Sequence, residues 1–384
     1  MQNTHQAKMS NLLIDNWTLQ CVGTLLSNGL VGGTASELEV APEQNDFSYK
    51  AVPQDALNVR CLFQVLNNLV FTDALFVEGE HADTWRQFDE LETLYSDGLV
   101  IPKPFQDIRQ EWLPIRQCFV EELCVCPIMR EHHEENVRTF KESGRSADPY
   151  FGQLIWGGAG MLARAHVLSI PYNSHPVREA WFGRVDSLFG LRSAERRFRE
   201  FVAEQRVKVL NRIDSGGYLV RLHLPPIAAL AIQEAQQPGD LLKIALQLRE
   251  QYASLRQWLS EFQTALDTSD THDLLAREKL LQSVARHIDA HCSAFPVGDT
   301  TVQIGVDWLK TTFKSGDPIN SAKNLVGVRA LMNRLVLAPA GGGIARKLAK
   351  LFGEEKSRLG RELETELGRS VSMSDKPDVI LREI

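Results

Sequence analysis

Apolar positions recur at helical spacing through much of the chain. In residues 57–69 the apolar side chains are three or four positions apart: Leu57, Cys61, Leu62, Val65, Leu66 and Leu69. A second helix is predicted from Pro127 to about Ser143, because proline suits a first turn and Gly144 suits a helix end. Asp148 and Pro149 form another helix start, followed by small residues at 157–160 that permit close packing. Most residues should therefore lie in helices.

Shorter segments have the pattern of strands. They are Trp17–Val22, Ala74–Val77, Val100–Ile101, Tyr218–Leu222 and Thr301–Val306. Pro114 should interrupt a helix between Gln106 and Cys124, since proline lacks the backbone N–H that a helix interior uses. The expected fold class is mainly α, with a minor α+β part at the N-terminus.

A heptad stripe begins at Asp240, a candidate N-cap. Its apolar members are Leu241, Ala245, Leu248, Tyr252, Leu255, Leu259, Phe262 and Leu266. A second helix over residues 274–291 would complete a long antiparallel hairpin at 240–292. The stripe at 240–266 could instead join two copies of the chain as a homo-oligomer.

The length and the charge distribution predict more than one domain. A chain of 384 residues exceeds what one hydrophobic core usually organises. Residues 1–150 have a charge balance of −12, whereas residues 151–384 have +5. We predict an acidic α+β domain at 1–146, a helical domain at 147–298 that contains the hairpin, and a basic C-terminal module at 299–384 with a loose tail.

Composition narrows the class of protein. Hydrophobic residues make up 43% and charged residues 24%, which are ordinary values for folded proteins. The N-terminal residues lack the pattern of a secretory signal, and the six cysteines form no compact framework. We therefore expect a soluble cytoplasmic protein with reduced thiols, with peripheral attachment to a membrane as an alternative.

The most polarised segment, residues 301–353, has a local charge balance of +6. Within it, Ile344–Phe352 predicts an amphipathic helix, and the candidate anion-binding cations are Arg334, Arg346, Lys347 and Lys350. This pattern favours an interaction or regulatory protein that contacts a protein partner, nucleic acid or an anionic membrane surface. A membrane-active effector is a further hypothesis, and the structural alternative is a helix that caps its own core.

A polar loop supplies the candidates for chemistry. Tyr172 and Asn173 are candidate binding residues, and His175 and Arg178 are weak catalytic candidates. They would suit an enzyme acting on nucleic acid or a small molecule, although Ser174 and His175 could equally cap the next helix. Carboxylates around residues 73–90 form a second candidate site, for a magnesium-dependent nuclease.

The sequence predicts no metal site and no cofactor. The nearest zinc ligand set is Cys118, Cys124, Cys126, His132 and His133, and its spacing departs from that of known zinc motifs. Glycines at 157–160 and 341–343 lack the residues that complete a phosphate-binding loop.

Overall fold

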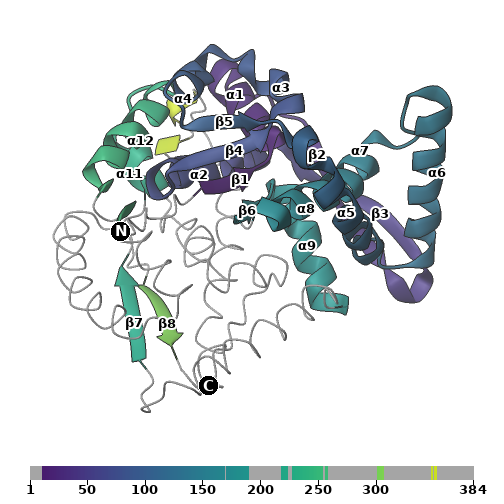
Figure 1. The fold of residues 1–384 in the computed structure, drawn as a ribbon. Helices are drawn as coiled ribbons and strands as arrows, with labels where there is room; N and C mark the ends of the chain where they lie inside the picture. Colours follow the sequence, from purple (N-terminus) through teal and green to yellow (C-terminus); the bar gives the residue numbers. More distant parts are fainter. Residues whose placement is uncertain are drawn as a thin grey trace.

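A four-stranded parallel sheet, with helices packed around it, organises the described part of the chain (Figure 1). The computed structural model describes residues 11–168, 170–189, 218–223, 227–253, 256–257, 301–306, 347–348 and 350–352. Helices hold most of these residues, and the strands are fewer and shorter. The predicted fold class is therefore confirmed in its broad form, mainly α with a smaller strand-containing part near the N-terminus.

The central sheet has four strands. They are β1 (Asn11–Ile14), β4 (Ala74–Glu78), β5 (Val100–Lys103) and β6 (Tyr172–Asn173). Their order across the sheet is β5-β4-β1-β6, and every neighbouring pair is parallel. Leu12 lies opposite Leu75, and Leu13 lies opposite Tyr172. All four carboxyl ends therefore meet at one edge, as parallel pairing requires.

Helices cover both faces of the sheet. The first face packs against α1 (Asn16–Asn28), α2 (Gln54–Phe71), α11 (Ile227–Glu234) and α12 (Asp240–Gln251). The second face packs against α5 (Arg109–Leu123), α8 (Gly158–Leu168) and α9 (Pro176–Phe189). The side chains of β1 alternate accordingly, with Leu12 and Ile14 in the first core and Leu13 in the second.

The remaining elements connect or flank this core. The antiparallel hairpin of β2 (Thr34–Ala41) and β3 (Asp46–Pro53) turns through η1 (Pro42–Gln44). Short turns join β4 to β5, namely η2 (Gly79–His81), α3 (Asp83–Arg86), η3 (Asp89–Leu91) and α4 (Glu92–Ser96). Between β5 and β6 lie η4 (Phe105–Ile108), α5, α6 (Pro127–Ser143), α7 (Pro149–Gly152), the π-helical turn η5 (Gln153–Gly157) and α8. A separate antiparallel pair joins β7 (Tyr218–His223) to β8 (Thr301–Val306).

Most local predictions are confirmed. The helices expected around residues 57–69 and at Pro127–Ser143 form, and Gly144 ends the latter with φ +70°. The strands expected at 74–77, 100–101, 218–222 and 301–306 are also present. Asp148 caps α7 by accepting a hydrogen bond from the backbone N–H of Phe151 at 3.0 Å.

Two predictions are wrong. Residues 17–22 lie in α1, and the strand comes earlier, at Asn11–Ile14. Helix α5 also continues through Pro114. Pro114 and Gln110 are both exposed, so the helical hydrogen bond that the proline removes belongs to the solvent-facing side of α5.

The first part of the heptad stripe packs as expected. Leu241, Ala245, Leu248 and Tyr252 are buried, and α12 lies against α2. The second half of the predicted hairpin lies outside the described residues. The division at residue 146 stays a prediction, and β6 beyond that position pairs with β1 before it.

The C-terminal amphipathic segment contacts the first core. Leu348 is 0% exposed, and Leu351 and Phe352 pack against the same cluster. This arrangement occupies the apolar side chains that a lipid-inserting helix would need. No helix in the described part of the chain is long and apolar enough to cross a membrane.

Removing the Leu348 side chain tests this contact. Leu348→Ala should lower the free energy of unfolding by about 2–5 kcal/mol, because it leaves a cavity in a packed core. Lys350→Ala is the control, since Lys350 is exposed, and it should change the value by less than about 0.5 kcal/mol. Urea unfolding followed by tryptophan fluorescence measures both. Equal, small effects would contradict the packing described above.

Candidate functional site

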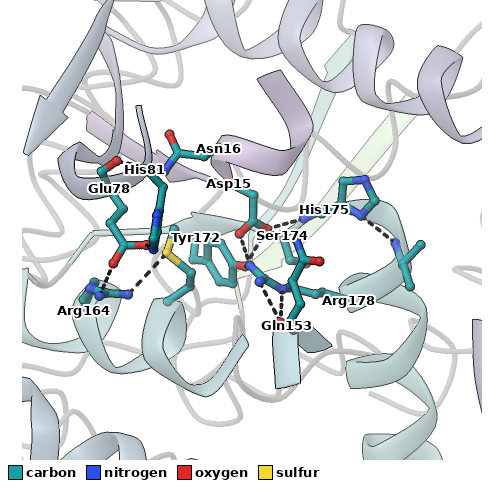
Figure 2. Close-up of polar contacts among 12 residues, drawn as sticks. Asp15, Asn16, Glu78, His81, Gln153, Arg164, Tyr172, Ser174, His175 and Arg178 are labelled. Atoms are coloured by element: carbon teal, nitrogen blue, oxygen red, sulfur yellow. Dashed lines mark hydrogen bonds and ion pairs between the residues drawn. The ribbon is translucent and has the colours of Figure 1, made fainter. Parts of the chain in front are cut away.

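The candidate site is centred on Asp15, which directly follows β1. Its carboxylate accepts hydrogen bonds from the Tyr172 hydroxyl and from the backbone N–H of His175, each at 2.6 Å, and it pairs with the Arg178 guanidinium (Figure 2). Asp15 also holds the N-cap position of α1, but its side chain does not cap the helix. The carboxylate instead joins the ends of β1 and β6, and all four residues are buried.

A distorted helical turn and two glycines position Arg178. The Gln153 carbonyl, at the start of the π-helical turn η5, accepts hydrogen bonds from Arg178 Nε at 3.2 Å and from Nη2 at 2.7 Å. A Cβ atom on Gly157 would lie 2.6 Å from Arg178 Nη2, and one on Gly158 would lie 3.7 Å from Arg178 Cδ. The predicted close packing is therefore present, and its partner is a guanidinium group. Turns of this π-helical type often occur at functional sites.

A second ion pair lies at the same edge of the sheet. Glu78 ends β4 and pairs with Arg164 from α8 (Figure 2). Asn16 Nδ2 donates to the Glu78 backbone carbonyl at 2.8 Å, and Asn16 Oδ1 accepts from Trp85 Nε1 at 2.6 Å. The second carboxylate oxygen of Glu78 lies 4.0 Å from Nε2 of His81, whose side chain is 68% exposed. Glu78 and His81 therefore present titratable groups at this edge.

Burial shifts the pKa values of the inner residues. The pKa of the Tyr172 hydroxyl is raised, mainly by burial and then by the charge of Asp15. The pKa of His175 is lowered, mainly by burial and then by the nearby Arg178 and Arg60 cations. Both groups are therefore neutral near pH 7. His175 is also stacked on Trp17, with ring centroids 3.8 Å apart.

One group of potential metal ligands lies beside His175. Among the described residues, only Cys21, Cys61 and His175 bring three such atoms together, and all three are buried. The backbone N–H of Val177 donates to His175 Nδ1 at 3.3 Å, so the neutral ring has its proton on Nε2, which faces Cys21 Sγ at 3.6 Å. A nitrogen that bears a proton cannot coordinate a metal. This arrangement therefore favours a hydrogen-bonded thiol cluster.

The structure brings together some of the residues selected from sequence. Tyr172, His175 and Arg178 share the Asp15 carboxylate, directly or through the backbone. Asn173 is half-buried, and its Nδ2 atom has no hydrogen-bond partner. Lys347 is half-buried and Lys350 is exposed, whereas Arg334 and Arg346 lie outside the described residues.

Sequence reasoning missed three central residues, Asp15, Gln153 and Arg164. It selected Gly157 for close packing but did not identify Arg178 as the side chain that packs there. The available signal was an acidic residue directly after an apolar run, because Leu12, Leu13 and Ile14 precede Asp15. Glu78 was included in the predicted acidic cluster, but its partner is a guanidinium group, as described above.

The topology places these residues at a switch point. Strands β1 and β6 are neighbours, but α1 follows β1 on the first face of the sheet and α9 follows β6 on the second. In doubly wound parallel sheets, ligands bind outside the carboxyl ends of the strands where the connections diverge in this way. Comparison with family models, curated proteins and solved structures gave no match. The sheet portion is therefore classed by topology, as a doubly wound α/β arrangement.

Loss of the Asp15 charge should strongly destabilise the fold. Asp15→Asn leaves the Arg178 guanidinium buried without its carboxylate, so the free energy of unfolding should fall by about 3–5 kcal/mol. Glu39→Gln is the control, because Glu39 pairs with Lys50 and Arg184 near the surface, and the loss there should be below about 1 kcal/mol. Urea unfolding of both variants is the measurement. A loss in Asp15→Asn no larger than in the control would show that the ion pair contributes little.

His175 should make stability depend on pH. In the unfolded chain it gains a proton as the pH falls below its ordinary pKa of 6.5, whereas burial keeps the folded form neutral. The free energy of unfolding should therefore fall with decreasing pH below that value, by at most about 1.4 kcal/mol per pH unit from this residue. His175→Gln should reduce the slope measured by urea unfolding at several pH values. Ser174→Ala, a neighbouring buried and non-titrating control, should retain it; an unchanged slope in His175→Gln would refute the assignment.

Proposed function

We propose that the protein is an enzyme that binds a small molecule at the carboxyl edge of its parallel sheet. The observation that carries this proposal is the coincidence of the polar cluster with the switch point between β1 and β6. Asp15, Tyr172 and Arg178 form a rigid base for the site, since each is buried and hydrogen-bonded. Asn173 and Glu78 end the flanking strands on either side of β1.

Glu78 and His81 are the proposed acid-base pair. Arg164 holds one carboxylate oxygen of Glu78, so the other is directed toward the His81 imidazole. An imidazole can donate or accept a proton, and a carboxylate beside it can orient the ring. His81 is exposed and can reach a bound molecule, whereas His175 is enclosed by Trp17 and Cys21. We assign proton transfer to His81 and a positioning role to Arg178.

Several finer predictions remain part of the proposal. The three-domain division and the hairpin at 240–292 are retained as proposals, and helix α12 at Asp240–Gln251 is compatible with the first part of such a hairpin. Contact with an anionic partner through residues 301–353 is kept as a separate hypothesis based on charge. The membrane-effector alternative is less favoured, because Leu348 and its apolar neighbours pack against the core.

A binding screen followed by a turnover assay tests the proposed enzyme. Nucleosides, nucleotides, sugar phosphates and amino acids would be screened for a rise in melting temperature, and each compound that binds would be followed by mass spectrometry for conversion. His81→Ala should lower the turnover rate by about 10²–10⁴-fold, because it removes the proton-transferring group. Binding should remain, since the buried cluster of Asp15, Tyr172 and Arg178 that holds the sheet edge in place is unchanged.

Glu92→Gln provides the matched control, because Glu92 is an exposed carboxylate on α4 with no part in the site. It should leave both binding and turnover at the wild-type level. Conversion that His81→Ala leaves unchanged would contradict the assigned chemistry. The absence of any stabilising compound would contradict the small-molecule site.

A further inference from the structure

Two arginines approach each other beside the candidate site. Arg116 comes from α5 and Arg164 from α8, and both lie over Gly160. A Cβ atom on Gly160 would lie 3.2 Å from Arg164 Nη1 and 3.5 Å from Arg116 Cδ. The glycine thus leaves room for two like charges to be neighbours, and the Glu78 carboxylate paired with Arg164 is one anion that offsets their repulsion.

Aromatic rings fix the positions of both guanidinium groups. The Arg116 guanidinium carbon lies 3.6 Å from the ring centre of Trp156 and 4.9 Å from that of Trp112. The Arg164 guanidinium carbon lies 4.3 Å from the Trp112 ring centre. Stacking of this kind holds the planar donor groups in place before any ligand binds, which reduces the entropy lost on binding.

Several donors of the pair have no oxygen acceptor among the described residues, although Arg164 Nη1 lies 3.8 Å from Met161 Sδ. Arg164 is 7% exposed and uses Nη2 for Glu78, but its buried Nε has no hydrogen-bond partner. In the described part of the chain, Arg116 contacts aromatic rings and donates to no oxygen. The pKa of Arg116 is lowered to about 10 by burial and by the charge of Arg164. An unpaired buried donor costs free energy, which an anionic ligand would recover.

We infer that Arg116 and Arg164 form a subsite for a phosphate group on the small molecule bound at the sheet edge, an inference that rests on the proposed function. Arg164 connects the two locations, because the same guanidinium also holds Glu78. Arg109 adds an exposed cation on α5, so three arginines stand against the Glu78 and Glu80 carboxylates and the cluster keeps an excess of positive charge. An anionic phosphate complements this excess and offers enough oxygens for the Arg116 fork and Arg164 Nε.

Inorganic phosphate is the probe that tests this subsite. A thermal-shift titration at constant ionic strength, with chloride as the balancing anion, should show a saturable rise in melting temperature. Arg116→Gln should weaken the apparent Kd by about 10-fold or more, because it removes a charged hydrogen-bonding group. Arg138→Gln is the control, since Arg138 is an exposed arginine paired with Glu135 on α6, and it should leave the Kd unchanged.

If Arg116 and Arg164 only pack against the tryptophan rings, phosphate should have no saturable effect on the melting temperature of the wild type. Alternatively, phosphate should bind Arg116→Gln as tightly as the wild type. Either outcome overturns the inference. If Arg116→Gln does not fold, Arg116→Lys retains the charge and the side-chain stem but loses the planar fork, and it should still weaken phosphate binding. Arg116-dependent phosphate binding without any hit in the small-molecule screen would support the subsite and overturn the proposed function. A hit in the small-molecule screen without Arg116-dependent phosphate binding would overturn the subsite alone.

Discussion

The buried ion pair between Asp15 and Arg178 is the constraint on which the described architecture depends. Two charges removed from water lose solvation energy, and their attraction compensates only when the remaining polar atoms are also paired. Here Tyr172 and the His175 backbone donate to the carboxylate, while Arg178 donates to the Gln153 carbonyl. The pair therefore fixes β1, β6, α9 and the π-helical turn relative to one another. Such a network favours one arrangement of these elements over alternatives in which a charge would be left unpaired.

The glycines at 157, 158 and 160 show how local sequence supports this network. Because Gly157 and Gly158 have no Cβ, the Arg178 side chain can pass beside them and reach the Gln153 carbonyl. In the same way, Gly160 leaves room for Arg116 and Arg164. Small residues on a helix ordinarily indicate that another helix packs closely. The observed neighbours are long charged side chains as well as Phe182, so the same pattern that permits close packing also admits guanidinium groups to the interior.

Sequence predicted the elements whose signals are local. The apolar spacing of α2 and the proline and glycine at the ends of α6 are contained within each helix, and both helices form as expected. Strand β1 was missed because it has four residues and lies directly before an amphipathic segment whose spacing was mistaken for a strand. The loop residues Tyr172, His175 and Arg178 could be selected because they are close in sequence. Asp15 could not be joined to them, since its partners are 157–163 positions away and no local pattern encodes such a pairing.

The two ion pairs at the sheet edge differ in how many of their polar atoms have partners within the protein. This difference suggests a structural role for the Asp15–Arg178 pair and a ligand-facing role for the Glu78–Arg164 pair. Around Asp15 the carboxylate oxygens are occupied by protein donors, and Arg178 is held by protein acceptors on both sides. Around Glu78 one oxygen faces an exposed imidazole, Arg164 keeps an unpaired buried N–H, and Arg116 adds a charge without a carboxylate of its own. A closed network resists exchange with ligands, whereas an incomplete one gains free energy when a complementary group arrives. The Glu78 side is therefore the better place for the proposed chemistry, and the Asp15 side supplies the rigidity that holds it in place.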